Sequence, residues 1–311
     1  MNSLLARLFG RRSVAAASLV QRYGTAPSKF LRLPSGTIAH YREYLPSGKR
    51  TDCPILLVHG ASLSLFSWEP WVQRLQSSMH IITVDLPGHG LTGATADGDY
   101  GAAALQVFIE TFTRALGLDA RFVLVGHSMG GHVAWRFALE HPERLAGLVL
   151  IAPGGITAPG GPQRQSARLV RMPGGAVLLR ALLSRGRMTS ALKAIVFDPS
   201  LISPAMTDLQ WDLICRPGTF DATVARLRSA SFDPAMVQRL GEISLPTLIL
   251  WGRDDIVFPV SQAGQFTGAI PSARLVVYED CGHWPMLECP DRSVEELVAF
   301  TSALDAHAIP A

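Results

Sequence analysis

The sequence has few cysteines and no long uninterrupted apolar run. None of its four cysteines (Cys53, Cys215, Cys281 and Cys289) falls into a C-x-x-C spacing, and a chain of 311 residues needs no disulfide framework to be stable. We therefore expect reduced thiols, which favour a cytoplasmic location. Apolar stretches stay well short of the roughly 20 residues that a membrane-spanning helix needs, so a transmembrane protein is not expected.

Familiar metal-binding spacings are also missing. Neither the histidines His59, His89, His127 and His132 nor the scattered carboxylates fall into a recognised ligand spacing. We expect no metal and no cofactor, and chelators should leave any activity unchanged.

Negative charge is almost absent from the N-terminal part of the chain. Residues 1–50 contain nine of the 28 basic residues but a single acidic residue, Glu43, whereas the net charge of the whole chain is only +3. The basic excess lies in a terminal arm, residues 1–30, and no nucleic-acid-binding motif accompanies it. Nucleic acid is therefore not an expected partner.

Three interpretations of this basic N-terminal arm compete. A secretory signal fits poorly, because the apolar stretch at 14–20 is short and Arg22 follows it without a convincing cleavage site. An interfacial helix within residues 1–25 would give a weak peripheral membrane contact, with Arg7, Arg11, Arg12 and Arg22 facing anionic lipid. A short helix that packs on the protein or frays is the simplest interpretation.

Beyond the arm, short segments of β-branched and aliphatic residues alternate with stretches of helix length. The expected strands cover residues 36–44, 54–58, 80–84, 122–125, 148–151, 246–250 and 275–278, and the clearest helices cover 101–117, 129–141 and 292–304. This alternation predicts an α/β fold with a doubly wound, mostly parallel sheet.

The alternation stops between residues 154 and 235, where glycine and proline separate short helical segments. We interpret 154–235 as a helical cap or lid, and we assign 31–153 and 236–311 to the α/β core. Such an insertion would lie over the carboxyl edge of the sheet.

A serine surrounded by glycines marks the end of one expected strand. In FVLVGHSMGGHVAW, residues 122–135, Ser128 lies where a buried strand becomes a helix, and Gly126 and Gly130 give the close approach that such a turn requires. G-x-S-x-G turns expose the serine hydroxyl at the carboxyl edge of a sheet. Plain connections and phosphate-binding turns have similar composition, so a base, an acid and an oxyanion donor must also be found.

A histidine and two aspartates follow the last two expected strands. His283, in CGHWPMLECP, follows the final strand and precedes the final helix, so it should project from the same edge as Ser128. Asp254 and Asp255, in LPTLILWGRDDIVFP, follow the preceding strand. A serine hydroxyl needs a histidine to accept its proton and an acid to orient that histidine. Either aspartate is a candidate for the acid.

Two backbone N–H groups are candidates for an oxyanion hole. Met129 follows the nucleophile at the start of a helix, and Ala61 follows His59-Gly60 in LLVHGASLSLFSW. His59 is a tempting catalytic residue itself, but the base position is already occupied, so we expect its ring to fix the turn.

Taken together, these motifs resemble the α/β-hydrolase superfamily from about residue 30 onward. They are HG at 59–60, DLPGHG at 85–90, GHSMGG at 126–131, GRDDIVFP at 252–259 and GHW at 282–284. The resemblance implies an α/β-hydrolase fold with a helical lid inserted after the sixth strand. It also implies that the second acidic position, Asp255, is the acid of the triad.

Two further segments resemble the lidded branch of that superfamily, which contains serine esterases, epoxide hydrolases, haloalkane dehalogenases and meta-cleavage C–C hydrolases. They are SWEPW at 67–71 and FDPSLISPAMTDL at 197–209. In that branch epoxide hydrolases and dehalogenases use an aspartate nucleophile, so Ser128 argues against both.

We predict a cofactor-independent serine hydrolase that acts on a small, hydrophobic carboxylic ester through an acyl-enzyme on Ser128. Four aromatic residues that neighbour the catalytic loops in sequence are candidates for the substrate pocket: Phe66, Trp68, Phe258 and Trp284. One alternative is a C–C hydrolase of meta-cleavage type, although HGASLSLF lacks the Gly/Ser/Pro-rich turn typical of such enzymes. A second alternative is a ligand-binding member of the fold that hydrolyses nothing.

Overall fold

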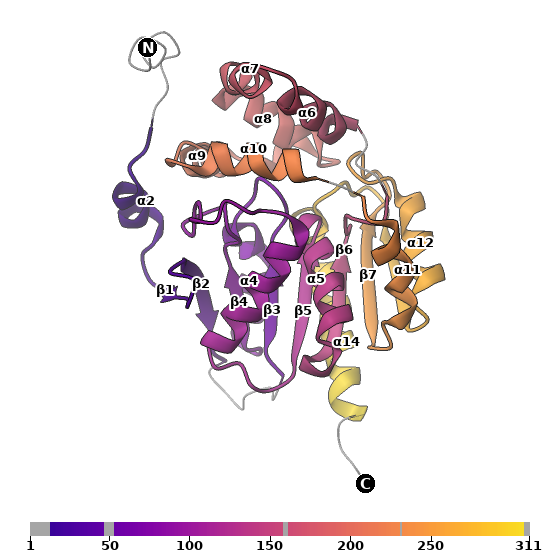
Figure 1. Ribbon diagram of the computed structural model, residues 1–311. Helices are drawn as coiled ribbons and strands as arrows, with labels where there is room; N and C mark the ends of the chain where they lie inside the picture. Colours follow the sequence, from indigo (N-terminus) through magenta and orange to yellow (C-terminus); the bar gives the residue numbers. More distant parts are fainter. Residues whose placement is uncertain (1–12, 47–52, 158–160, 231, 308–311) are drawn as a thin grey trace.

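An eight-stranded, mostly parallel sheet forms the centre of the protein (Figure 1). The computed structural model describes residues 13–46, 53–157, 161–230 and 232–307. The strand order is β1-β2-β4-β3-β5-β6-β7-β8, and only β2 pairs antiparallel, with β1 and with β4. The strands are β1 Ser28–Arg32, β2 Ile38–Tyr44, β3 Ile55–Val58, β4 Ile81–Val84, β5 Phe122–His127, β6 Leu145–Ile151, β7 Thr247–Gly252 and β8 Ala273–Tyr278.

Both faces of the sheet are covered by helices. Successive side chains of a strand point to opposite faces, so Leu56 and Val58 of β3 belong to one apolar cluster and Ile55 and Leu57 to the other. The first face packs against α4 Ala102–Ala115, α5 Met129–Glu140 and α12 Ala263–Ala269. The second packs against α3 Glu69–Leu75, α13 Pro285–Glu288 and α14 Pro290–His307.

The fold class predicted from the sequence is confirmed, and all seven expected strands are present. The sequence did not reveal β1, because its residues Ser28–Arg32 are exposed or half-buried and lack the apolar pattern of a central strand. It is an edge strand, paired on one side only. The clearest expected helices correspond to α4, α5 and α14, with bounds that differ by one to three residues.

Five helices are inserted after β6, the sixth strand, as the resemblance implied. They are α6 Gly161–Arg171, α7 Gly175–Leu182, α8 Arg185–Ala194, α9 Pro204–Ile214 and α10 Thr219–Ser229. Figure 1 shows them above the sheet, at the end where β5 leads into α5. A short helix, α11 Pro234–Gln238, leads back to β7. The division into a core and a cap at 154–235 stays a proposal.

An N-terminal helix, α2 Ala16–Tyr23, packs against this insertion (Figure 1). Leu19 is fully buried, in a cluster that also contains Leu213 of α9. Arg22 forms an ion pair with Asp212, and the Tyr23 hydroxyl donates a hydrogen bond of 2.9 Å to the same carboxylate. This part of the arm therefore packs on the protein. The predicted membrane contact also involves Arg7, Arg11 and Arg12, which lie outside the described residues, so that contact stays a prediction.

None of the described helices is long and apolar enough to cross a membrane. No disulfide joins any two of the four cysteines, all of which are among the described residues. The cytoplasmic location inferred from their number and spacing stays a prediction.

Candidate active site

Ser128 lies in a strained turn between β5 and α5. Its backbone angles are φ 55° and ψ −112°, a combination that costs a non-glycine residue about 1–3 kcal/mol. A Cβ atom at Gly126 would lie 2.2 Å from the carbonyl oxygen of Gly130, and a Cβ atom at Gly130 would lie 2.2 Å from that of Val58. The two glycines thus permit the close packing that keeps the serine in this conformation.

Three side chains from separate loops form one line of hydrogen bonds. The Oγ of Ser128 lies 3.0 Å from Nε2 of His283, and Nδ1 of His283 lies 2.7 Å from Oδ2 of Asp255. An ionised carboxylate can only accept, so Nδ1 carries the ring proton and Nε2 has a free lone pair. The imidazole is thereby oriented to accept the serine proton.

Of the two candidate acids, the structure places Asp255 beside His283. Its other oxygen, Oδ1, accepts hydrogen bonds from the backbone N–H groups of Val257 (2.8 Å) and Phe258 (2.9 Å). Asp255 is buried, whereas Asp254 is exposed and only its backbone N–H is bonded, to the carbonyl oxygen of Cys281 at 2.9 Å.

Glu288 fixes the loop that holds His283, a role that the sequence did not suggest. Its Oε2 accepts from the N–H of Gly282 (2.8 Å), and its Oε1 accepts from the N–H of Trp284 (2.9 Å). Oε2 also accepts from the N–H of Phe197, at 2.7 Å, in the inserted helical region. The sequence did contain a clue to this role. Glu288 lies only five residues after His283, on the short helix that follows the same loop.

The turn at 59–61 lies against Ser128. A Cβ atom at Gly60 would be 3.1 Å from the Cβ of Ser128. The N–H of Leu86 donates to Nε2 of His59 (3.0 Å), so Nδ1 carries the proton and donates to the carbonyl oxygen of Gly60 (2.8 Å). Burial lowers the pKa of His59, which keeps the ring neutral. His59 therefore holds the turn, as its predicted structural role requires.

The two expected oxyanion donors, Ala61 and Met129, both belong to segments that adjoin Ser128. Ala61 lines the cavity next to Ser128, and Met129 is the first residue of α5. The first N–H groups of a helix have no acceptor within it, and no acceptor for the N–H of Ala61 or Met129 is found among the described residues. Their role in stabilising an oxyanion stays a prediction.

A second buried histidine, His127, supports the loop of His283. Its Nε2–H donates to the carbonyl oxygen of His283 at 2.8 Å. Burial, followed by the neighbouring His283, lowers the pKa of His127 well below its usual value, so the ring stays neutral. Nothing in the sequence distinguished this position, because the G-x-S-x-G pattern allows any residue type before the nucleophile.

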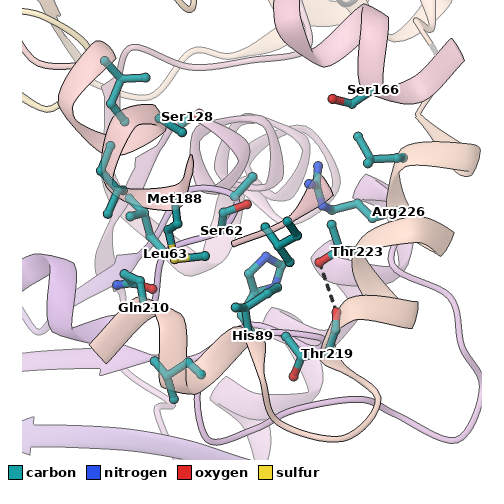
Figure 2. Close-up of a pocket in the computed structure, with 18 of the residues that line it drawn as sticks. Ser62, Leu63, His89, Ser128, Ser166, Met188, Gln210, Thr219, Thr223 and Arg226 are labelled. Atoms are coloured by element: carbon teal, nitrogen blue, oxygen red, sulfur yellow. Dashed lines mark hydrogen bonds between the residues drawn. The ribbon is translucent and has the colours of Figure 1, made fainter. Parts of the chain in front are cut away.

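Ser128 opens into a cavity of about 670 Å³ between the sheet and the inserted helices (Figure 2). This volume lies within the range of about 300–1,000 Å³ that is usual for small-molecule sites. Most of the cavity surface is apolar, and its larger apolar lining residues are Leu63, Leu179, Leu182, Leu183, Met188, Leu192, Ile195, Leu213, Ile214, Phe220, Leu227, Ile256 and Val257.

The four aromatic residues expected in the pocket do not line this cavity. Trp68 and Trp284 are buried in the apolar cluster beneath the sheet. Phe66 packs against the guanidinium of Arg42 at 4.5 Å, and Phe258 contacts the ring of His283 edge-on at 5.5 Å between centroids. Closeness to a catalytic loop in sequence did not place these rings in the cavity, because each packs into the adjacent core.

Within the described residues, no group of three or more histidine, cysteine or acidic side chains is arranged to hold a metal ion.

Comparisons with known proteins agree with this architecture. The family model described as "alpha/beta hydrolase fold" matches residues 54–290. A monoacylglycerol lipase from Xenopus laevis is 29% identical over 263 residues, which cover 81% of this chain and 76% of that protein. A 2-hydroxy-6-oxononadienedioate/2-hydroxy-6-oxononatrienedioate hydrolase from Paraburkholderia phymatum is 30% identical over 292 residues, which cover 88% of this chain and 96% of that protein.

Solved structures show the same likeness. A putative lipase from Acinetobacter baumannii superposes with a TM-score of 0.73 at 26% identity and covers 96% of this chain and 99% of its own. A meta-cleavage product hydrolase from Pseudomonas fluorescens has a TM-score of 0.75 at 23% identity, with 88% and 97% covered. The second likeness concerns the fold alone.

Proposed function

The chain belongs to the α/β-hydrolase family, and from that premise we propose that it is a serine hydrolase that cleaves carboxylic esters with a hydrophobic part. The observation that supports this proposal best is the hydrogen-bonded line of Ser128, His283 and Asp255 at a largely aliphatic cavity. Hydrolase activity itself follows from the family. The ester as substrate and the individual roles of the residues are the proposal.

The proposed reaction proceeds through an acyl-enzyme. Ser128 Oγ attacks the ester carbonyl while His283 Nε2 takes its proton, and Asp255 stabilises the imidazolium that forms. The N–H groups of Ala61 and Met129 donate to the developing oxyanion. The protonated His283 then passes the proton to the leaving alcohol, and a water molecule, deprotonated by the same ring, releases the acid.

The inserted helices provide most of the cavity wall, so we propose that residues 154–235 act as a lid. Leu179 of α7, Leu192 of α8 and Leu227 of α10 come from three different helices of the insertion and line the cavity that contains Ser128. A wall of this kind excludes water and favours an apolar acyl or alcohol group.

The test of the proposed function is turnover of p-nitrophenyl esters by the wild-type protein and by Ser128→Ala. We expect the substitution to reduce kcat by ~10⁴-fold or more, because the members of a triad act as a unit. Unchanged circular dichroism and thermal unfolding of the variant would show that the fold is intact. A variant that keeps most of the activity would contradict the mechanism, and a wild-type protein that turns over no ester would favour the ligand-binding alternative.

A second candidate, C–C bond hydrolysis, is favoured by one observation. The relative from Paraburkholderia phymatum, which by its name is a hydrolase of 2-hydroxy-6-oxononadienedioate and 2-hydroxy-6-oxononatrienedioate, matches 88% of this chain. The same three side chains would serve that reaction. Release of a dienoate from a ring-cleavage product, measured next to ester turnover under the same conditions, separates the two candidates by their kcat/KM.

A further inference from the structure

One face of α10 presents polar side chains to the largely apolar cavity. Thr219, Thr223 and Arg226 are spaced by four and three residues, so they lie on one side of the helix. All three line the cavity, and Figure 2 shows the Arg226 side chain directed into it, on a different side from Ser128.

The charge of Arg226 has no partner in the part of the chain that the structure describes. No hydrogen bond or ion pair joins its guanidinium to another described residue, and its Nε is buried without an acceptor. Burial lowers the pKa of Arg226 to about 10, and no carboxylate lies near enough to oppose that shift. The group is still protonated at neutral pH. A buried cation is normally paired, because its desolvation is costly.

Two neighbouring side chains also have unused polar atoms at the cavity. The hydroxyl of Thr219 is buried without a partner. His89 donates from Nδ1 to the carbonyl oxygen of Pro87 (3.0 Å), while its Nε2 has no partner. Burial, with His59 and then Arg226, lowers the pKa of His89 to about 3, so its ring is neutral and adds no second charge.

The loop of His89 lies against α10. A Cβ atom at Gly88 would be 2.9 Å from the Cβ of Ala222, one helical turn before Arg226. The three side chains with unused polar atoms, Thr219, Arg226 and His89, therefore form one polar subsite between α10 and the loop that follows β4.

We propose that this subsite binds a carboxylate of the substrate, so that the hydrolysed ester has an apolar chain with an acidic group remote from the scissile bond. The proposal rests on the proposed function, because it places the scissile carbonyl at Ser128. A planar guanidinium offers two parallel N–H donors to a carboxylate. A second arginine at the cavity, Arg187, is exposed and donates to the carbonyl oxygen of Leu182 at 2.8 Å. One negative charge is therefore enough to neutralise Arg226, the cation without a partner among the described residues.

Two matched pairs of esters test the proposal. One pair places the charge on the acyl side, with mono-p-nitrophenyl adipate against p-nitrophenyl hexanoate. The other places it on the alcohol side, with the butanoate ester of ω-hydroxyhexanoic acid against hexyl butanoate. We expect the acidic member of one pair to have the higher kcat/KM. Arg226→Met should reduce that value by about 10- to 100-fold and change the value for the neutral member much less.

Matched variants distinguish the role of Arg226 from a general charge effect. Arg168→Met removes the same charge from an exposed position of α6 and should preserve the preference for the acidic ester. Arg226→Lys keeps the positive charge but lacks the planar guanidinium, so it should preserve part of the preference for the acidic ester. Normal turnover of the neutral esters by Arg226→Met would show that this variant folds.

The outcomes separate this proposal from the proposed function. If no ester is hydrolysed, the proposed ester function is wrong. The subsite can then still be tested by calorimetry, as binding of monomethyl adipate to Ser128→Ala. Adding Arg226→Met to that variant should abolish the binding. If the neutral esters are hydrolysed but neither acidic ester is preferred, the subsite proposal is wrong. A preference that Arg226→Met leaves intact would also overturn it.

Discussion

At the scale of single residues, Ser128 depends on conformational strain that its neighbours maintain. The positive φ of Ser128 directs Oγ towards Nε2 of His283, and the strain persists only because Gly126 and Gly130 allow strand, helix and turn to approach closely. The sequence revealed this feature because the strain has a local cause that glycine spacing records.

The acid of the proposed triad can be tested by its hydrogen-bond geometry. In Asp255→Asn, the carbonyl oxygen should keep the N–H groups of Val257 and Phe258, which leaves the amide NH₂ facing His283. Nδ1 must then accept, the ring proton moves to Nε2, and Ser128 loses its base. We expect kcat on a p-nitrophenyl ester to fall by about 10³–10⁴-fold.

The exposed Asp254 provides the matched control. Asp254→Asn changes the same charge without touching the imidazole, so kcat should stay within a few-fold of the wild-type value. The opposite ranking of the two variants would transfer the role of the acid to Asp254.

At the scale of elements, the structure shows where sequence patterns were informative and where they were not. Central strands such as β3 and β5 were predictable because burial on both faces demands continuous apolar residues. Two other features depended on tertiary packing. The edge strand β1 lacks that pattern, and the spacing of Thr219 and Arg226 on α10 does not reveal that their face points into the cavity. The contact of α10 with the loop at Gly88 determines that orientation.

The N-terminal helix α2 offers a prediction about stability. Asp212 is buried and its carboxylate is paired with Arg22 and Tyr23 of α2. Deletion of residues 1–25 would remove both of these partners and uncover the apolar cluster that Leu19 forms with Leu213. We expect a clear decrease in the thermal midpoint and, because Leu213 of α9 lines the cavity, a higher KM for hydrophobic esters.

Deletion of residues 1–12 alone is the control for this experiment, because it keeps α2 in place. It should leave the thermal midpoint unchanged, and adding Asp212→Asn to the longer deletion should recover part of the loss. Equal midpoints for the full chain and the longer deletion would show that α2 does not support the insertion.

At the scale of the whole molecule, the α/β core could be predicted from the sequence, whereas the residues that line the cavity could not. Motif residues from four loops meet at Ser128 because parallel strands end at one edge of the sheet. The cavity wall depends on how the inserted helices pack on that edge. This is why the aromatic residues Trp68 and Trp284 were expected at the site but lie in the core.

Buried neutral histidines give the folded protein a specific dependence on pH. The pKa values of His59, His89 and His127 are all lowered, that of His89 to about 3. Below their usual pKa of about 6.5 the unfolded chain binds protons that the folded chain does not. The free energy of unfolding should therefore fall between about pH 7 and pH 5, by at most about 1.4 kcal/mol per pH unit for each ring.

Urea unfolding at several pH values measures this slope. Asp85 does not contribute in the same window. Burial opposes its ionisation, but His40, His59 and the N–H of Leu65 outweigh burial and hold its pKa at about 2. Its stabilising effect is therefore lost only as the pH falls below about 4. In His89→Gln the slope should be smaller than in the wild-type protein. An unfolding free energy that is constant between the two pH values would contradict the prediction.

The hydrogen bonds between the loop of His283 and residues 195–197 also restrict how the insertion can move. The N–H of His283 donates to the carbonyl oxygen of Ile195 at 2.7 Å, and Glu288 accepts from Phe197 at 2.7 Å. A translation of all five inserted helices would break both bonds, whereas a rotation about residues 195–197 preserves them. We therefore expect residues 195–197 to act as the axis of any movement of the inserted helices. Atomic displacements in the insertion should increase with distance from residues 195–197. The imidazole of His283 should keep its position between Ser128 and Asp255 while substrate enters.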